Sequence, residues 1–132
     1  MPEGSRNAGS ASDIPGSHDT DNRIVYAFAG RLVEQKGIPL LLDALRLLRP
    51  EDDILVRIYG EGPLAPMVLD AEREGLPLVY AGYHPDPMSD VGRIRALLFP
   101  SDVREGLGYV VLDAFVRSVP VISHDLPGLR GL

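Results

Sequence analysis

Short apolar runs alternate with segments of helical periodicity along most of the chain. The runs Arg23–Ala29, Ile54–Gly60 and Pro77–Gly82 are rich in β-branched, aromatic and other apolar residues and predict buried strands. Two further strands are predicted at Ala96–Pro100 and Val119–Ser123. Because these runs are continuously apolar, the pattern favours a parallel sheet that is covered on both faces.

The segments between the predicted strands carry the signals of helices. Gly37–Leu48 repeats leucine at helical spacing and has Pro39 in its first turn. Helices are also predicted at Pro63–Glu74 and Gly108–Ser118, with a short helical piece at Val91–Arg95. This alternation predicts a doubly wound, Rossmann-like α/β domain of about five strands, in an order such as 3-2-1-4-5.

Residues 1–22 differ in composition from the rest of the chain. Ser, Gly, Asp and Pro dominate this segment, which contains almost nothing to bury. The pattern therefore predicts a flexible linker or tail at 1–22 and one domain at 23–132. A chain of 132 residues is long enough for such a domain to bury a core.

The composition narrows the classes of function. A net charge of -6 argues against a nucleic-acid partner and against an anionic membrane surface. The chain has no cysteine, which excludes a disulfide or a thiolate metal site. It shows neither a signal-peptide pattern nor a run of roughly 20 apolar residues. These features predict a cytoplasmic protein without a transmembrane segment.

Two unusual loops follow the first and the fourth predicted strands, at Gly30–Gly37 and Pro100–Gly108. In a doubly wound sheet, ligands bind beyond the carboxyl ends of the strands, where the winding reverses. We therefore expect these loops to be neighbours and to form a binding site.

The first loop carries Arg31 and Lys36 close to the start of a predicted helix, where the helix dipole disfavours cations. A bound phosphate would resolve this conflict, since backbone N–H groups and cations bind it together. The alternative is that both residues are solvated surface cations. The second loop offers the amides of Gly106, Leu107 and Gly108, also at a predicted helix start.

Two carboxylates frame the start of the last predicted helix. Glu105 is either a ligand for the substrate or a favourable charge near the helix N-terminus. Asp113 lies in a helix that is apolar nearly all round, so we expect it to be largely buried, where an unpaired carboxylate is costly. A carboxylate suits the hydroxyls of a ribose or hexose, and the cations suit phosphates. The alternative places Asp113 on a narrow solvated stripe near Arg117.

Three motifs occur in order on the expected elements. They are GRLVEQKG from Gly30, GEGP from Gly60, and PSDVREGLGYVVLDAFVRSVPVIS from Pro100. Across Arg23 to Leu132 the chain resembles the C-terminal, nucleotide-sugar-binding domain of retaining group 1 type glycosyltransferases, which have the GT-B fold and are family 4-like. The resemblance implies half of a GT-B fold that is incomplete at its C-terminus and lacks the N-terminal, acceptor-binding domain.

The resemblance also implies roles for individual residues. Arg31 and Lys36 would hold the diphosphate, and Glu105 would hydrogen-bond the donor sugar, with no metal and no cofactor. Asp113 stands where the family has a glutamate that takes the ribose hydroxyls, and it is one methylene shorter. Ser118 replaces a glycine that usually precedes the last strand.

The loop after the third strand is where such domains hold the base, although the side chain of His84 has no visible acidic partner and reads as an ordinary loop residue. The predicted catalytic residues are Glu105, Arg31 and Lys36. The predicted substrate-binding residues are Gly30, Arg31, Lys36, Gly82, Tyr83, His84, Glu105, Gly106, Leu107, Gly108 and Asp113.

The predicted function is the donor-binding part of a retaining hexosyltransferase, which moves a sugar from a nucleoside diphosphate sugar to an acceptor hydroxyl. Without the acceptor domain, the chain is expected to bind weakly and not to catalyse. The alternatives are a non-catalytic nucleotide-binding or interaction module, and a nucleotide-sugar epimerase or glycan phosphorylase of related fold. A dinucleotide oxidoreductase is disfavoured, because no Gly-x-Gly-x-x-Gly follows the first strand. The edge formed by the fifth strand predicts self-association.

Overall fold

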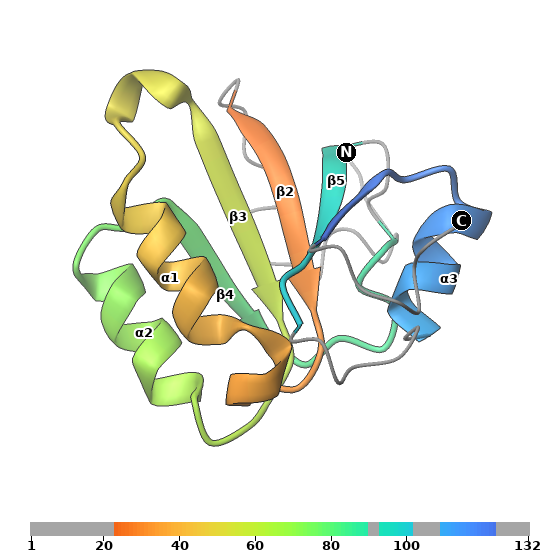
Figure 1. The fold of residues 1–132 in the computed structure, drawn as a ribbon, viewed down its shortest axis with the longest axis horizontal. Helices are drawn as coiled ribbons and strands as arrows, with labels where there is room; N and C mark the ends of the chain where they lie inside the picture. The colour runs from red at the N-terminus through yellow and green to blue at the C-terminus, as the bar shows by residue number, and fades with distance from the viewer. Residues whose placement is uncertain (1–22, 90–92, 102–108, 124–132) are drawn as a thin grey trace, which may run out of the picture.

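A five-stranded parallel sheet forms the centre of the molecule (Figure 1). The structure is a computed structural model, which describes residues 23–89, 93–101 and 109–123. The spatial order of the strands is β4-β3-β2-β5-β6, which corresponds to 3-2-1-4-5 in chain order, so the predicted doubly wound α/β fold is confirmed. The strands are β2 (Ile24–Ala29), β3 (Ile54–Tyr59), β4 (Leu78–Gly82), β5 (Ile94–Phe99) and β6 (Val121–Ser123).

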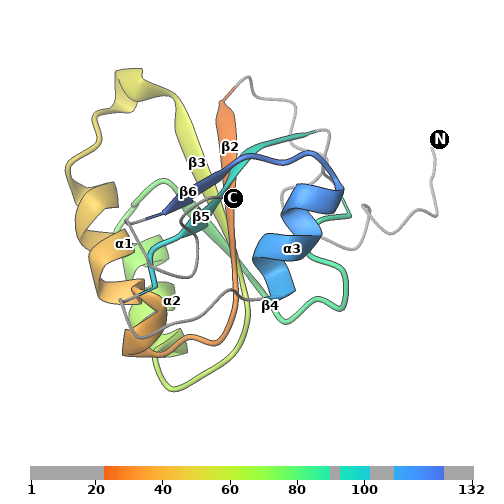
Figure 2. The same cartoon turned by 45° about the vertical axis from the view of Figure 1, so that its right-hand side comes forward.

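Helices cover both faces of the sheet. α1 (Ile38–Arg46) and α2 (Ala65–Arg73) lie on one face, and α3 (Tyr109–Val116) lies on the other (Figures 1 and 2). This arrangement follows from right-handed crossovers between parallel strands when the winding reverses after β4. Two short 3-10 turns, η2 (Glu34–Lys36) and η3 (Pro50–Asp52), precede α1 and β3.

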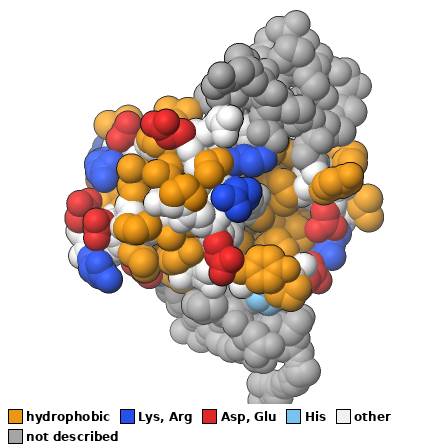
Figure 3. All heavy atoms as spheres, turned by 90° about the horizontal axis from the view of Figure 1, so that it is seen from below, with side chains coloured by type: hydrophobic (Ala, Val, Ile, Leu, Met, Phe, Trp, Pro, Cys, Tyr) orange, Lys and Arg blue, Asp and Glu red, His pale blue; other side chains and the backbone are white. Residues whose placement is uncertain are grey.

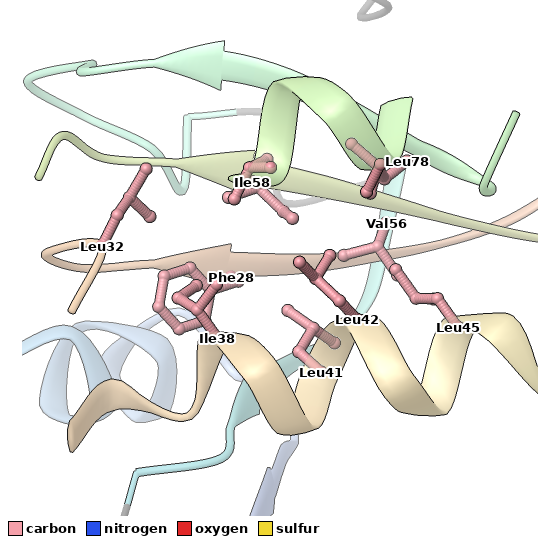
Figure 4. Packing of buried hydrophobic residues seen from close by; sticks show 11 residues of the cluster. Phe28, Leu32, Ile38, Leu41, Leu42, Leu45, Val56, Ile58 and Leu78 are labelled. Carbon is pink, nitrogen blue, oxygen red and sulfur yellow. The ribbon is translucent and has the colours of Figure 1, made fainter. Parts of the chain in front are cut away.

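Alternate residues of the central strands supply two separate apolar layers. On β2, Phe28 packs in the layer under α1 and α2, whereas its neighbour Ala27 packs in the layer under α3. Ile58 and Tyr59 divide in the same way on β3. Figure 4 shows the first layer, in which leucines of α1 meet side chains of the sheet. The continuous apolar runs in the sequence therefore reflect burial on both faces.

One local prediction was wrong. The helical piece expected at Val91–Arg95 is not formed at its C-terminal end, where Ile94 and Arg95 belong to β5. Ile94 pairs with Val25 of β2 and is 7% exposed, so pairing within the sheet outweighs the local preference. Val91 lies outside the described residues.

Ser118 adopts the left-handed conformation, with a φ of 62°. It lies between α3 and β6, and its N–H donates a hydrogen bond to the carbonyl of Phe115. This conformation is strained for a residue with a side chain and favours glycine. The backbone conformation at this position therefore favours the glycine that Ser118 replaces.

β6 is an edge of the sheet, and the side chain of Ile122 on this strand is about half exposed. Self-association through this edge stays a prediction, as does the boundary between a tail at 1–22 and a domain at 23–132, because the tail lies outside the described residues. Among the described helices, none has the length and apolar character that a membrane crossing requires.

Candidate functional site

A cleft of about 340 Å³ opens where β2, β3 and β4 end. This is the edge of the sheet at which doubly wound domains bind ligands. Figure 3 views the molecule from this side and shows Lys and Arg side chains gathered near the middle of the face, close to acidic and hydrophobic side chains. The cleft is lined by Ala29, Gly30, Arg31, Tyr59, Gly60, Glu61, Tyr83, His84 and Pro87.

Backbone hydrogen bonds hold the three loops of the cleft together beyond the ends of the strands. The Gly30 N–H donates to the carbonyl of Tyr59 at 3.1 Å, and the Leu32 N–H donates to the carbonyl of Glu61 at 2.9 Å. The Gly60 N–H donates to the carbonyl of Gly82, also at 2.9 Å. Because buried backbone groups are paired in this way, the walls of the cleft are fixed by main chain.

Glycine is required where the first two loops meet. Gly60 has a φ of 142°, and a Cβ atom at this position would lie 1.8 Å from the carbonyl oxygen of Gly30. No side chain fits at such a distance. The GEGP motif, which begins at Gly60, therefore serves the close approach of the loops after β2 and β3.

The loops after β2 and β5 are neighbours, as expected from the sequence. Gly37 ends the first loop with a φ of 86°, and a Cβ atom there would lie 2.0 Å from the carbonyl oxygen of Pro100. Pro100 directly follows β5. The structure thus places the described start of the second loop against the N-terminus of α1.

The two predicted cations both lie near Gly30, but only Arg31 is among the described residues that line the cleft. Arg31 is exposed and lines the cleft directly. The side chain of Lys36 extends back over Gly30, with its Cδ 3.9 Å from the ideal Cβ position there. α1 has no side-chain N-cap and no acidic residue in its first turn.

The conflict between the cations and a helix dipole is smaller than the sequence indicates. Lys36 is the last residue of η2, where a positive charge is favourable, and α1 starts only after Gly37. The sequence pattern did not predict this 3-10 turn. The phosphate argument therefore rests on Arg31 in the cleft and on Lys36 beside Gly30 at its edge.

Tyr80 supports the turn at Gly60 from β4. Its hydroxyl donates a hydrogen bond of 2.8 Å to the Gly60 carbonyl. Burial, and secondly the negative charge of Glu61, raise the pKa of Tyr80 above its ordinary value. Both effects keep the hydroxyl protonated, which is the form that donates this bond.

We expect Tyr80→Phe to lower the free energy of unfolding by about 1 kcal/mol near pH 8, because one hydrogen bond is lost. The pKa of Tyr80 is higher in the folded than in the unfolded chain, so its contribution is complete below a pH of about 10 and is lost as pH rises through the folded-state pKa. Urea unfolding of the unaltered chain and of Tyr80→Phe, at pH values from about 8 to above about 10, tests this prediction. A difference between them that stays constant up to the highest pH would contradict the assignment.

Asp113 is less buried than expected from the sequence. Its side chain is 38% exposed, and its Oδ1 accepts a hydrogen bond of 3.0 Å from Nε of Arg117. Only Val111 and Ala114 of α3 are buried, because one face of this helix packs on the sheet. The prediction of a largely buried Asp113 was therefore wrong, and the residue takes the position near Arg117 that the alternative described.

The structure brings together part of the predicted site. Gly30, Arg31, Tyr83 and His84 line one cleft, Lys36 reaches its edge, and Gly82 ends the strand beside it. The predicted residues Glu105, Gly106, Leu107 and Gly108 lie outside the described residues, and Asp113 is not part of the cleft lining.

Sequence reasoning missed five of the lining residues, although their signal was available. Ala29 ends the first predicted strand, and Tyr59, Gly60 and Glu61 come at the end of the second. Ligands bind beyond the ends of several strands. Pro87 follows the third strand within the same turn-rich loop as His84.

A second hollow, of about 360 Å³, lies between α1 and the β5–β6 side of the sheet. None of the lining residues that the structure describes is charged, and such an apolar lining does not suit a diphosphate. Its lining is Tyr26, Leu40, Leu41, Ala44, Leu45, Leu48, Ile54, Val56, Leu98, Phe99, Pro100, Ile122 and Ser123.

Known proteins share this fold and sequence pattern. The α-D-kanosaminyltransferase of Streptomyces kanamyceticus is 26% identical over 118 residues, which are 85% of this chain and 30% of that protein. The apo structure of the lipopolysaccharide outer core galactosyltransferase WaaB superposes with a TM-score of 0.69 at 26% identity, over 82% of this chain and 32% of the other. Anabaena Alr3699/HepE in complex with UDP has a TM-score of 0.68 at 22% identity, over 81% and 31%.

The chain thus spans about a third of the length of each of these proteins. The sequence profile described as "Glycosyl transferases group 1" matches residues 23–132, which include every described helix and strand. A match of this extent shows that the chain belongs to the group 1 glycosyltransferase family.

Proposed function

We propose that this chain is the donor-binding part of a retaining glycosyltransferase, which moves a sugar from a nucleoside diphosphate sugar to an acceptor hydroxyl. The observation that carries this proposal is that Arg31, with Lys36 beside it at Gly30, shares one cleft with Tyr83 and His84. Cations suit a diphosphate, and an exposed aromatic ring such as that of Tyr83 suits the flat face of a base.

Solved relatives of the same fold support this choice of ligand. Anabaena Alr3699/HepE has been solved with UDP and with UDP-glucose, and the latter structure superposes on this chain with a TM-score of 0.67. A cleft of about 340 Å³ falls in the usual size range of small-molecule sites. A nucleoside diphosphate is therefore the probe of first choice.

In this proposal, the chemistry to be assisted is departure of the nucleoside diphosphate. Negative charge grows on the leaving phosphate, and fixed positive charge stabilises it most when it is already in place. Arg31 and Lys36 supply that charge. Glu105 orients the donor sugar, and the amides of Gly106, Leu107 and Gly108 assist it.

The acceptor hydroxyl comes from a domain other than the one at 23–132. Because the chain spans about a third of its relatives, we expect it to bind the donor weakly by itself and to leave the sugar untransferred. Binding, not turnover, is therefore the property to measure.

The direct experiment is a thermal-shift and calorimetric comparison of UDP, GDP, ADP and dTDP with their nucleosides. One diphosphate should bind with measurable affinity and exceed its own nucleoside clearly, because most of the charge recognition is directed at phosphate. A chain that binds none of the four diphosphates at millimolar concentration would refute the donor-binding function.

A non-catalytic nucleotide-binding module is the second candidate. The pairing of Asp113 with Arg117 favours it, because a carboxylate already engaged by a guanidinium is less available to ribose. The two functions differ in the role of Asp113, which binds the ribose hydroxyls in the donor-binding domain and does not bind them in the module. Substitution of Asp113 therefore distinguishes the two functions.

We expect Asp113→Asn to weaken binding of the ribonucleotide about tenfold, with the 2′-deoxy form much less affected, because the amide loses the charge that strengthens bonds from hydroxyls. Asp113→Glu should preserve or improve binding. Calorimetric titration of the unaltered chain and of both variants with UDP and with 2′-deoxy-UDP tests this prediction.

The matched control is Asp43→Asn, which also removes a helix carboxylate paired with an arginine, Arg46 at 3.1 Å. This variant should bind both ligands as the unaltered chain does. Equal affinities of all four proteins for both ligands would leave Asp113 without a ribose role and favour the module.

A further inference from the structure

Arg117 joins two segments that are far apart in the sequence. Its Nε donates to Oδ1 of Asp113 on α3 at 3.0 Å, and its Nη2 lies 3.0 Å from Oδ1 of Asp86 in the loop after β4. The side chain of Arg117 is 32% exposed, so these contacts form at the margin of the protein interior. One guanidinium thereby holds the loop against the helix.

The contact continues from Asp86 to the wall of the cleft. The backbone N–H of Asp86 donates to Nδ1 of His84 at 2.9 Å, which in the neutral ring leaves the hydrogen on Nε2. The ring of His84 also meets the edge of Tyr59, with 6.3 Å between centroids and 67° between planes. Both of these rings line the cleft.

The same loop is anchored a second time by apolar contact. Met88 is fully buried in the layer that contains Val111 and Ala114 of α3. Met88 fixes the distance between loop and helix, but a flexible thioether side chain gives little orientation. Two hydrogen-bonding arms of one planar guanidinium, directed at two carboxylates, supply that orientation.

We propose that Arg117 is a positioning residue, which sets the loop after β4 against α3 and so fixes the His84 wall of the cleft relative to Asp113. The assignment of the cleft to a nucleotide rests on the proposed function, whereas the anchoring of the loop does not. The base and the ribose of one nucleotide would contact the two segments that Arg117 joins. Its removal should therefore affect the nucleoside half of the ligand and spare the phosphates.

The chain contains a matched control in Arg46. Its Nη1 lies 3.1 Å from Oδ1 of Asp43 on the same helix, and its Nη2 lies 3.6 Å from Oε1 of Glu74 just after α2. Arg46 thus also bridges a near and a distant carboxylate, but no residue of this group lines the cleft. Arg117→Gln and Arg46→Gln remove the same charge and the same kind of ion pair.

The first measurement needs no ligand. Amide hydrogen exchange by NMR on the 132-residue chain should become at least fivefold faster at Asp86 and Ser89 in Arg117→Gln, because the loop loses its oriented anchor. Arg46→Gln should leave these amides unchanged. Unchanged exchange in Arg117→Gln would overturn the proposal, whatever the ligand proves to be.

The second measurement compares UDP with inorganic pyrophosphate. Arg117→Gln should weaken UDP binding five- to tenfold and leave pyrophosphate binding unchanged, while Arg117→Lys, whose single ammonium cannot reproduce the two-armed bridge, should fall between. Equal losses for UDP and pyrophosphate, or equal UDP affinity in Arg117→Gln and Arg46→Gln, would overturn the positioning role. Failure of the unaltered chain to bind UDP would count against the proposed ligand, while the exchange measurement still decides the anchoring.

Discussion

Gly37→Ala is expected to lower the free energy of unfolding by about 3 kcal/mol, the largest stability loss that we predict for this chain. Part of this loss is conformational, since a φ of 86° costs a residue with a side chain about 1–2 kcal/mol. The rest comes from the carbonyl oxygen of Pro100, which lies 2.0 Å from the position of the new Cβ. That oxygen belongs to the main chain and cannot rotate away, so the loop after β5 must move.

Gly75→Ala is the control that separates these two causes. Gly75 follows α2 and has a φ of 97°, but nothing lies within 4 Å of its ideal Cβ position. It should therefore show only the conformational part, about 1 kcal/mol. Urea unfolding of the three proteins gives both values. Equal losses for Gly37→Ala and Gly75→Ala would mean that the two loops are not in contact at Pro100.

The fold could be predicted because its signals are local and repeated. Each buried strand is an apolar run, each helix is amphipathic or apolar, and right-handed crossovers leave few strand orders. The misassigned segment is Ile94–Arg95, where partners on β2 decide the structure. Those partners are distant in the sequence, and local periodicity contains no information about them.

The candidate site could be predicted less completely, because a side chain's environment depends on which helix face packs. Apart from Asp113, the residues of α3 are apolar on nearly all sides of the helix, which indicated that Asp113 is buried. In the structure, only Val111 and Ala114 of this helix are buried. The ion pair of Arg117 with Asp86 joins residues 31 positions apart, which local patterns do not reveal. The pair of Arg117 with Asp113 is only four residues apart and matches the alternative that the sequence offered. The glycine contacts of Gly60 were equally invisible, although the motif containing Gly60 was recognised.

Replacing both Arg31 and Lys36 with Ala is expected to weaken binding of UDP about 100-fold or more. Each charge-assisted contact contributes about 1.5–3 kcal/mol, and about 1.4 kcal/mol corresponds to a factor of ten. Arg31 is exposed, so the lower end of that range applies to it. Binding of uridine should change less than about threefold, because the nucleoside carries no charge for these side chains to recognise.

The charge-matched control is Arg49→Ala with Arg73→Ala. Both arginines are exposed and pair only with local carboxylates in the described part of the chain, and neither lines the cleft. Each double variant removes two positive charges from a chain of net charge -6. The long-range attraction between the protein and the anionic ligand therefore falls by a similar amount in both. Calorimetry with UDP and uridine at two salt concentrations completes the test. If the control loses as much UDP affinity as Arg31→Ala with Lys36→Ala, or if uridine and UDP are weakened equally, the two residues are solvated surface cations and the cleft holds no diphosphate.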